Sequence, residues 1–397
     1  MAETPGYFSS PAPFPGRFIE YFRRVTQPQL QRACGQLLSV GFDGLTAPTE
    51  LLDRIARSEV GGVMLFRPNI ESPAQVAALV LALRQAGPAA APLVISVDQE
   101  GGLVQRLRAP LTVWPDMGSV AAAGDVQRTR AVGRALGGEL AALGIGWDFA
   151  PVLDVHTNPT NPVIGNRAFG SRVETVTDHA LAFWRGLHDA GLLGCGKHFP
   201  GHGDTHADSH LELPSVAHDD ERLRAVELAP FAAAARAGIE ALMTAHVLYP
   251  SWDAKMPATL SRRIAHDILR GELGFAGMLV SDDLGMRAVA DNFAVEDLVV
   301  QSLLAGVDHF LVREPLDRQV RAFEALVKAS EAREDVRRRI TESAERVARF
   351  KSRLRVPMPA SADALSALLG NKDNQSLSDS FARLTTLSVA HSPVVDA

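Results

Sequence analysis

The sequence predicts an α/β fold in which eight parallel strands close into a single (β/α)8 TIM barrel. Short apolar runs of strand length alternate with longer stretches of helical periodicity eight times over about 320 residues. The runs are apolar throughout, as expected when helices cover both faces of a parallel sheet. No Gly-x-Gly-x-x-Gly motif follows a strand, which weakens the alternative of an open, dinucleotide-binding sheet.

The strands are recognised as apolar runs bounded by Gly, Pro or polar residues. They cover residues 37–42, 61–66, 92–97, 145–150 together with 152–155, a run that opens at 192–193 and leads to Lys197 and His198, then 241–246, 278–283 and 307–312. The helices between them show apolar residues at helical spacing, as Val76, Leu79, Val80 and Leu83 do. They cover residues 49–58, 73–87, 126–143, 174–190, 220–237, 261–272, 293–304, 316–330 and 332–354.

Composition divides the chain into one regular domain and two flanking segments. Residues 1–27 are rich in Pro, Gly and Phe and are expected to form an irregular arm, whereas 28–355 form the barrel. Residues 356–397 carry weak helical patterns near 362–369 and 377–386 and are interpreted as an appendage. Within the appendage, residues 374–391 resemble the start of a second domain, which would make the tail a remnant of one.

Charge and cysteine content exclude several classes of protein. The chain has 397 residues, a net charge of −6 and a pI near 6.1, so it lacks the basic surface of a nucleic-acid or membrane-surface binder. Its two cysteines, Cys34 and Cys195, indicate no disulfide framework. No secretory signal or membrane-spanning run is recognised, so we expect a cytoplasmic enzyme, monomeric by default.

Polar side chains gather where the predicted strands end. In a barrel these ends meet on one face, and the active site is built there. The convergence therefore indicates a site more strongly than any single motif does. The residues are Asp98 and Glu100, Asp154 and His156, Lys197 and His198, His246, and Asp282 and Asp283.

Residues 194–210 hold the densest group of titratable side chains. Four histidines recur every fourth residue, at 198, 202, 206 and 210, which on a helix would suggest a metal site. Pro200, Gly201 and Gly203 argue against a helix here, so we expect neither a metal nor a cofactor. His202 and His206 are interpreted as parts of the loop structure.

The carboxylates suit the cleavage of an acetal. That reaction needs a proton donor on the leaving oxygen and a carboxylate against the oxocarbenium-like carbon. Asp282 follows a rigid strand and suits the carboxylate role, although Asp282 and Asp283 could also be a helix cap. Asp208 and His210 lie two residues apart, so the carboxylate could orient the imidazole as a general acid and base.

Six ordered segments resemble glycoside hydrolase family 3, in its bacterial β-N-acetylglucosaminidase branch that serves cell-wall recycling. They fall in family order across roughly residues 36–315. They are 97–102 (Val-Asp-Gln-Glu-Gly-Gly) with 104–106 (Val-Gln-Arg), 149–155 (Phe-Ala-Pro-Val-Leu-Asp-Val), 164–167 (Ile-Gly-Asn-Arg), 196–204 (Gly-Lys-His-Phe-Pro-Gly-His-Gly-Asp) followed by 208–210 (Asp-Ser-His), 245–247 (Ala-His-Val) and 281–284 (Ser-Asp-Asp-Leu).

The resemblance implies a role for each matching residue. Asp282 would be the nucleophile, and His210 the general acid/base paired with Asp208. His246 would support the pocket floor, and Glu100 would stand behind the sugar contacts. The terminal sugar's hydroxyls would be bound by Asp98, Arg106, Arg167, Lys197 and His198. The implied activity is a retaining exo-β-N-acetylglucosaminidase acting on a small carbohydrate, most simply a muropeptide fragment.

Four alternatives stay open at this point. A β-glucosidase or a glycoside phosphorylase could share the same motifs. A metal-dependent amidohydrolase barrel could use the same histidines and aspartates, and a non-catalytic sugar-binding barrel could keep the pocket alone. Leu103 and Gly285 depart from the branch, which commonly has a basic residue and a serine there. These two positions put the outer substrate site in doubt, not the catalytic residues.

Overall fold

The computed structural model describes residues 26–89, 91–209, 213–355, 357, 359 and 361–382. In these residues one eight-stranded parallel sheet has the order β6-β3-β2-β1-β10-β9-β8-β7. The outermost strands of this order meet through two parallel bridges, Trp147 to Leu193 and Val152 to Lys197, which nearly close the barrel. The strands are β1 (Leu38–Val40), β2 (Gly62–Leu65), β3 (Val94–Val97), β6 (Trp147–Asp148), β7 (Cys195–Phe199), β8 (Ala241–Thr244), β9 (Met278–Asp283) and β10 (His309–Val312).

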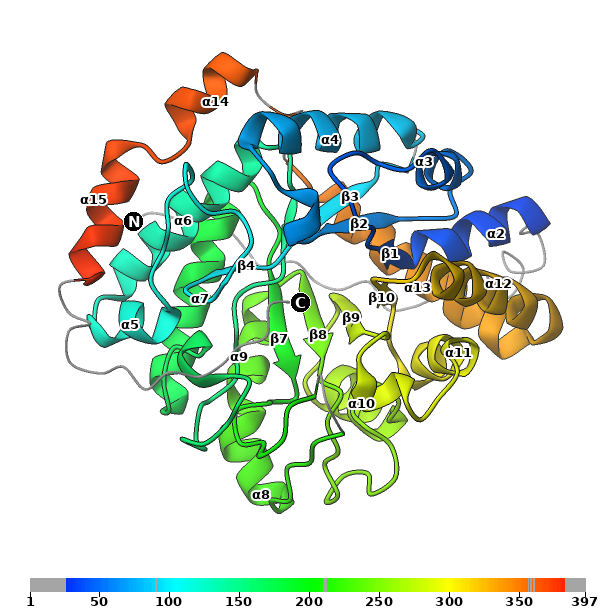
Figure 1. Ribbon diagram of the computed structural model, residues 1–397. Helices are drawn as coiled ribbons and strands as arrows, with labels where there is room; N and C mark the ends of the chain where they lie inside the picture. Colours follow the sequence, from blue (N-terminus) through cyan, green and yellow to red (C-terminus); the bar gives the residue numbers. More distant parts are fainter. Residues whose placement is uncertain are drawn as a thin grey trace, which may run out of the picture.

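Helices surround this sheet, as Figure 1 shows, and the predicted (β/α)8 barrel is confirmed. Shorter elements lie in the loops: η1 (Arg67–Asn69), the hairpin of β4 (Gln99–Gly101) and β5 (Val104–Gln105), α5 (Met117–Ala122), η2 (Gly165–Arg167), α8 (Asp220–Arg222), η3 (Leu223–Glu227) and α10 (Arg287–Ala290). The surrounding helices are α2 (Gln27–Gln36), α3 (Thr49–Ala56), α4 (Pro73–Ala86), α6 (Val126–Ala142), α7 (Val173–Asp189), α9 (Ala229–Ala237), the π-helix η4 (Arg263–Glu272), α11 (Val295–Ala305), α12 (Leu316–Ala332) and α13 (Glu334–Ser352).

The helix predicted over residues 220–237 is broken in the structure. It begins as α8, widens into the π-helical turn η3, and continues as α9 with Pro230 in its first turn. Proline has no N–H to donate to the preceding turn, so the hydrogen-bond ladder is interrupted before it. The break places Glu227 at the end of η3, facing the loop that follows β7.

The strand predicted over residues 145–155 is also shorter than expected. Only Trp147 and Asp148 join the sheet as β6, and Val152 adds a single bridge to Lys197. Pro151 lies between these two contacts and cannot donate a ladder hydrogen bond. The chain is therefore free to turn here and to carry Asp154 toward β7.

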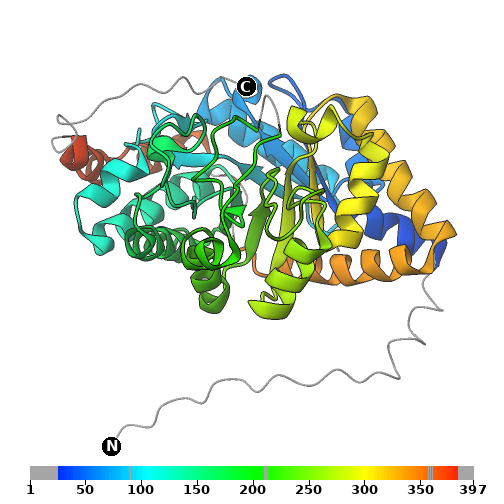
Figure 2. The ribbon, with the colours of Figure 1, turned by 90° about the horizontal axis from the view of Figure 1, so that it is seen from below.

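Two further helices follow the barrel, α14 (Ala362–Leu368) and α15 (Lys372–Ala382). Figure 2 shows them at one end of the molecule, beside α5 and α6. Phe381 is buried there, and the Arg128 guanidinium lies 4.2 Å from the centre of its ring. The predicted helical patch at 362–369 is present, whereas residues 383–386 lie outside the described part. None of the described helices combines the length and apolar character that a membrane span requires.

The base of the barrel is filled by aromatic rings around Trp147. Its ring centre lies 4.7 Å from that of Phe149, 4.9 Å from that of Phe350 and 5.8 Å from that of His309. The His309 Nε2 atom lies 2.7 Å from the Ser39 hydroxyl oxygen. Burial in this apolar layer lowers the pKa of His309 from 6.5 to about 3.

This lowered pKa predicts an acid sensitivity of folding. In the unfolded chain His309 becomes protonated below about pH 6.5, whereas in the folded chain it stays neutral down to about pH 3. The free energy of unfolding therefore falls as pH drops through this window. Between pH 7 and pH 5 the contribution is ~2 kcal/mol. Urea titrations at both pH values should show a smaller loss for His309→Gln than for the native chain. His188→Gln, at an exposed histidine, should keep the full loss; an equal loss in all three proteins would contradict the assignment.

Candidate active site

A cavity of ≈ 390 Å³ opens at the carboxyl ends of the strands, and seven predicted site residues line it. The eighth, His210, lies outside the described residues. Apolar side chains from several strands and loops complete the wall, among them Phe66, Phe149 and Met243. The predicted residues in the wall are Asp98, Arg106, Arg167, Lys197, His198, Asp208 and Asp282.

A buried ion network forms one side of the cavity. The Lys197 ammonium lies 2.7 Å from Asp98 Oδ1 and 2.6 Å from Glu100 Oε1. Arg167 donates two parallel hydrogen bonds to the Glu100 carboxylate, at 2.9 and 2.8 Å. Arg106 Nη2 lies 3.9 Å from Asp98 Oδ2 at the outer edge. Glu100 thus holds both cations in place behind Asp98.

The network keeps its charges over a wide pH range. Burial opposes ionisation of Glu100, but the charges of Arg167 and Lys197 outweigh it and lower the pKa of that carboxyl. Burial likewise opposes the charge on Lys197, but Asp98 and Glu100 raise the pKa of its ammonium. Both groups are therefore charged near neutral pH, and the site presents fixed donors and acceptors to a ligand.

A second buried carboxylate, Asp154, orients His198 at the same end of β7. The His198 ring donates from Nδ1 to Asp154 Oδ2 at 2.7 Å, and its backbone N–H donates to Oδ1 at 3.1 Å. The His202 backbone N–H donates to the same oxygen at 2.6 Å. Burial opposes ionisation of Asp154, but His198 lowers its pKa, so the carboxylate fixes this ring from behind.

Asp282 and Asp283 end β9 and differ in their surroundings. The Asp283 backbone N–H donates to Asp282 Oδ1 at 2.8 Å, which sets the orientation of the carboxylate that lines the cavity. The Asp283 carboxylate accepts from the backbone N–H groups of Gly285 and Arg313, at 2.9 and 3.1 Å. Asp283 is therefore occupied in joining β9 to the end of β10. Burial raises its pKa.

His246 lies beneath the cavity and not in its wall. Its Nε2 atom donates to the Asp283 carbonyl oxygen at 3.0 Å, and its Nδ1 atom accepts from the Thr259 hydroxyl at 2.8 Å. Burial lowers the pKa of the ring, so it stays neutral at neutral pH. The ring supports the strand end that carries Asp282 and Asp283.

The loop before His210 is folded onto the barrel through His202. The His202 ring lies 2.9 Å from Thr205 Oγ1 through Nδ1 and 3.0 Å from Ser209 Oγ through Nε2. Burial lowers the pKa of His202 to about 4, so the ring bridges the two hydroxyls in its neutral form. The bridge places Ser209, and with it Asp208, at the cavity.

Arg313 is a cavity residue that the sequence reasoning missed. It follows β10 directly, and its guanidinium carbon lies 4.3 Å from the centre of the Phe66 ring. The rule that found Asp98 and Asp282, a polar residue just after a strand, applies equally to Arg313. Arg67, which directly follows the strand predicted over 61–66, obeys the same rule and was missed as well. Arg108 also lines the cavity, but it lies in a loop where no strand end marks it.

Replacing Glu100 should show how much the network contributes to folding. The Glu100→Gln substitution leaves Lys197 and Arg167 buried with a single carboxylate, so we expect unfolding to become easier by ~3 kcal/mol. Urea unfolding measures this loss. Glu296→Gln removes a carboxylate that contacts Arg321 at 2.8 Å on the surface and should cost less than ~1 kcal/mol. Equal losses in the two variants would refute the structural role of Glu100.

With this geometry in place, the chain can be compared with known proteins. The model of the glycosyl hydrolase family 3 N-terminal domain matches residues 29–350. The chain belongs to glycoside hydrolase family 3. The resemblance seen in the sequence is confirmed, and a metal-dependent amidohydrolase is no longer an alternative.

Two similar proteins are both named beta-hexosaminidases. Beta-hexosaminidase A of Pseudoalteromonas piscicida is 36% identical over 359 residues, which cover 84% of this chain and 60% of that enzyme. The beta-hexosaminidase of Pseudomonas aeruginosa is 42% identical over 277 residues, covering 70% of this chain and 81% of that enzyme. The chain therefore spans 60% of the length of the first relative.

Solved family 3 structures have the same fold. A β-N-acetylglucosaminidase from Paenibacillus sp. str. FPU-7 superimposes with a TM-score of 0.83 at 41% identity, covering 89% of this chain and 68% of that one. NagZ from Neisseria gonorrhoeae, in complex with N-trifluoroacetyl-D-glucosamine, gives a TM-score of 0.72 at 30% identity. That comparison covers 89% of this chain and 98% of NagZ.

Proposed function

We propose that this chain is a retaining exo-β-N-acetylglucosaminidase. The observation that supports this most directly is that Asp282 lines the same cavity as Asp98 and Lys197. A strand-end carboxylate thereby borders the space in which the sugar ring would bind, beside the buried ion network. The beta-hexosaminidase names of the relatives and the N-trifluoroacetyl-D-glucosamine bound to NagZ agree with this assignment.

In the proposed reaction the sugar hydroxyls bind Asp98, Arg167 and Lys197, which are arranged before substrate arrives. Asp282 attacks the anomeric carbon while His210 gives a proton to the leaving oxygen, and a glycosyl-enzyme ester forms. His210 then takes a proton from water, which attacks the same carbon and releases Asp282. Two displacements leave the anomeric configuration unchanged. Asp208 would orient His210, as a carboxylate orients an imidazole in other acid–base pairs.

The direct test is turnover of an aryl β-N-acetylglucosaminide, with the first-formed product anomer followed by NMR. We expect the β-anomer to appear first. An α-anomer as the first product would refute the double displacement. Parallel assays with an aryl β-glucoside, and with added phosphate, separate this activity from its two family alternatives. A faster reaction with the glucoside, or a sugar 1-phosphate product, would favour a β-glucosidase or a phosphorylase.

For the natural substrate we propose a muropeptide fragment with an acidic group beyond the cleaved bond. Arg67, Arg106 and Arg108 line both the cavity and an adjoining depression of ≈ 250 Å³. The two spaces thus share a wall of guanidinium groups, which suit carboxylates. A sugar carrying a lactyl or peptide carboxylate would place its charge there.

Arg67→Ala tests this preference, because Arg67 is exposed in η1 at the shared wall. We expect kcat/KM for an acidic muropeptide fragment to fall about 10- to 150-fold, as one charge-assisted hydrogen bond contributes roughly 1.5–3 kcal/mol. Hydrolysis of neutral N,N′-diacetylchitobiose should be nearly unchanged and serves as the control. A similar fall for both substrates would contradict recognition of an acidic group.

A further inference from the structure

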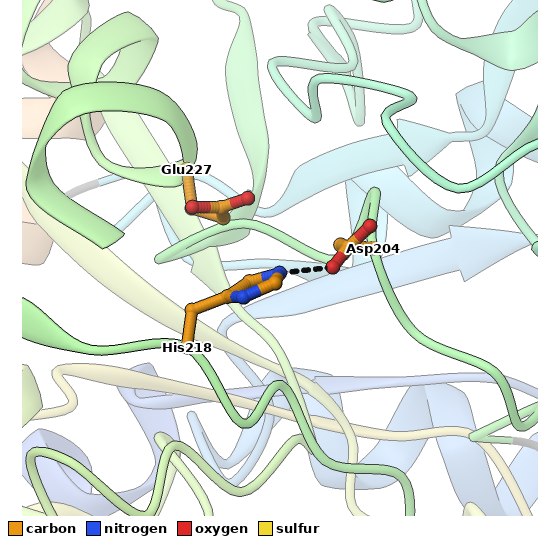
Figure 3. Close-up of side chains that lie close together, drawn as sticks. All are labelled: Asp204, His218 and Glu227. Atoms are coloured by element: carbon orange, nitrogen blue, oxygen red, sulfur yellow. Dashed lines mark hydrogen bonds and ion pairs between the residues drawn. The ribbon is translucent and has the colours of Figure 1, made fainter. Parts of the chain in front are cut away.

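Three side chains that the proposed reaction does not use lie together where the loop that follows β7 meets the end of η3. They are Asp204, His218 and Glu227, and Figure 3 shows them converging from two loop segments and from the end of η3. One potential ligand atom from each lies within 4.8 Å of the others. None of the three lines the sugar cavity. The cluster is therefore a separate feature of the molecule.

Glu227 is the unusual member, because its carboxylate is buried and only one of its two oxygens has a hydrogen-bond partner. Its Oε1 atom accepts from Arg222 at 3.1 Å, whereas its Oε2 atom is buried without a hydrogen-bond partner among the described residues. Only 1% of Glu227 is exposed. Burial raises its pKa in spite of Arg222. A buried carboxylate oxygen of this kind is costly unless a proton or a cation meets it.

The surrounding backbone holds the three residues in fixed positions. Gly201 has φ +137°, and a Cβ atom there would lie 2.8 Å from Glu227 Cβ, so the loop backbone packs directly on η3. The Tyr249 hydroxyl donates to the Gly201 carbonyl oxygen at 2.6 Å. Asp204 Oδ1 accepts from the Thr157 hydroxyl at 2.9 Å, while Oδ2 contacts His218 Nε2. The side chains thus face one another without a large rearrangement.

We propose that Asp204, His218 and Glu227 bind a divalent transition-metal ion, for which Zn²⁺ is the natural probe. One imidazole nitrogen and two carboxylate oxygens match the ligands that Zn²⁺ takes, and water completes the tetrahedron. The nitrogen donor disfavours Ca²⁺ and Mg²⁺, which select all-oxygen sites. Binding replaces the hydrogen bond between His218 Nε2 and Asp204 Oδ2 and supplies the cation that Glu227 Oε2 lacks.

This ion would have a positioning role and would take no part in the two displacements. Asp204 lies four residues before Asp208, and His218 lies ten residues after it. An ion bound by Asp204 and His218 would link the chain on the two sides of Asp208 and His210, and Glu227 would anchor that ion to η3. The site thus goes beyond the proposed function, which itself requires no metal.

The test measures Zn²⁺ affinity of the full-length, chelator-stripped protein by competition with a chromophoric chelator. We expect one site that persists in His210→Ala, which removes the histidine of the proposed acid/base pair as a competing ligand. In that background His218→Gln and Glu227→Gln should each weaken binding at least about 100-fold. His266→Gln, at a half-buried histidine beside Asp267 and outside the cluster, should leave affinity unchanged. Circular dichroism confirms that each variant is folded.

A second measurement locates the ion without any substitution. Anomalous diffraction at the zinc edge, from a crystal of the full chain soaked in Zn²⁺, should give a peak between His218 Nε2 and the two carboxylates. A peak at Asp208 or His210 alone would overturn the proposal. So would Zn²⁺ affinity that is unchanged by both His218→Gln and Glu227→Gln. Activity of the native chain on an aryl N-acetylglucosaminide is scored separately, so failure here leaves the proposed reaction intact.

Discussion

Asp282→Asn should lower kcat on an aryl β-N-acetylglucosaminide by on the order of 10⁴-fold while the chain stays folded. The amide keeps the shape of the side chain and can still accept the Asp283 N–H hydrogen bond at Oδ1. It lacks the charge and nucleophilicity that form the glycosyl-enzyme bond. Initial rates and a thermal unfolding curve for each protein measure the two expectations together.

The matched control is Asp291→Asn, the same chemical change at an exposed residue just after α10, beside Arg287. It should retain full activity. An Asp282→Asn protein with activity within a few-fold of the native chain would remove the nucleophile assignment. It would also leave the position of Asp282 in the cavity without a catalytic explanation.

His210→Ala should affect substrates according to how much their leaving groups need a proton. General acid catalysis contributes about 10²–10⁴-fold, so the loss should be of this size for a disaccharide, whose leaving alcohol is poor. An aryl glycoside with an acidic phenol leaves without help, and formation of the glycosyl-enzyme should be nearly unaffected. The pre-steady-state burst with the aryl substrate measures the rate of glycosyl-enzyme formation, and the steady-state rate with the disaccharide measures its turnover.

Asp208→Asn provides the companion measurement. If Asp208 orients His210 and supports its positive form, this variant should show the same dependence on the leaving group, with smaller losses. The pH profile of kcat/KM should shift as well, because the imidazolium loses its carboxylate partner. Equal losses on both substrates for His210→Ala would point away from a proton donor.

The periodicity of the sequence was sufficient to predict the barrel and the face on which its cavity opens. Apolar runs located the eight barrel strands, though not the hairpin of β4 and β5, and polar residues at the strand ends, Asp98 and Asp282 for example, line one cavity in the structure. This worked because the carboxyl ends of barrel strands converge whatever the loops do. Arg313 obeys the same rule and could have been named.

Other features depend on contacts between distant segments, which no local pattern records. Asp204 and Glu227 are 23 positions apart and meet only because Pro230 interrupts the helix and η3 turns Glu227 toward the loop. The evenly spaced histidines would suggest a metal only on a helix, which Pro200, Gly201 and Gly203 argue against, whereas His218 lies outside that spacing and belongs to the candidate site. The bridge from His202 to Thr205 and Ser209 is likewise a property of the folded loop.

The linked charges of Glu100, Lys197, Arg167 and Asp98 are complete without a ligand. The cost of bringing these groups out of water is therefore met during folding, when the rest of the barrel's core forms, and not at each encounter with a sugar. A ligand entering the site displaces solvent from a surface that already has its final shape. Tight and rapid capture of a small, neutral ring is the expected outcome, since little freedom is lost by the protein on binding.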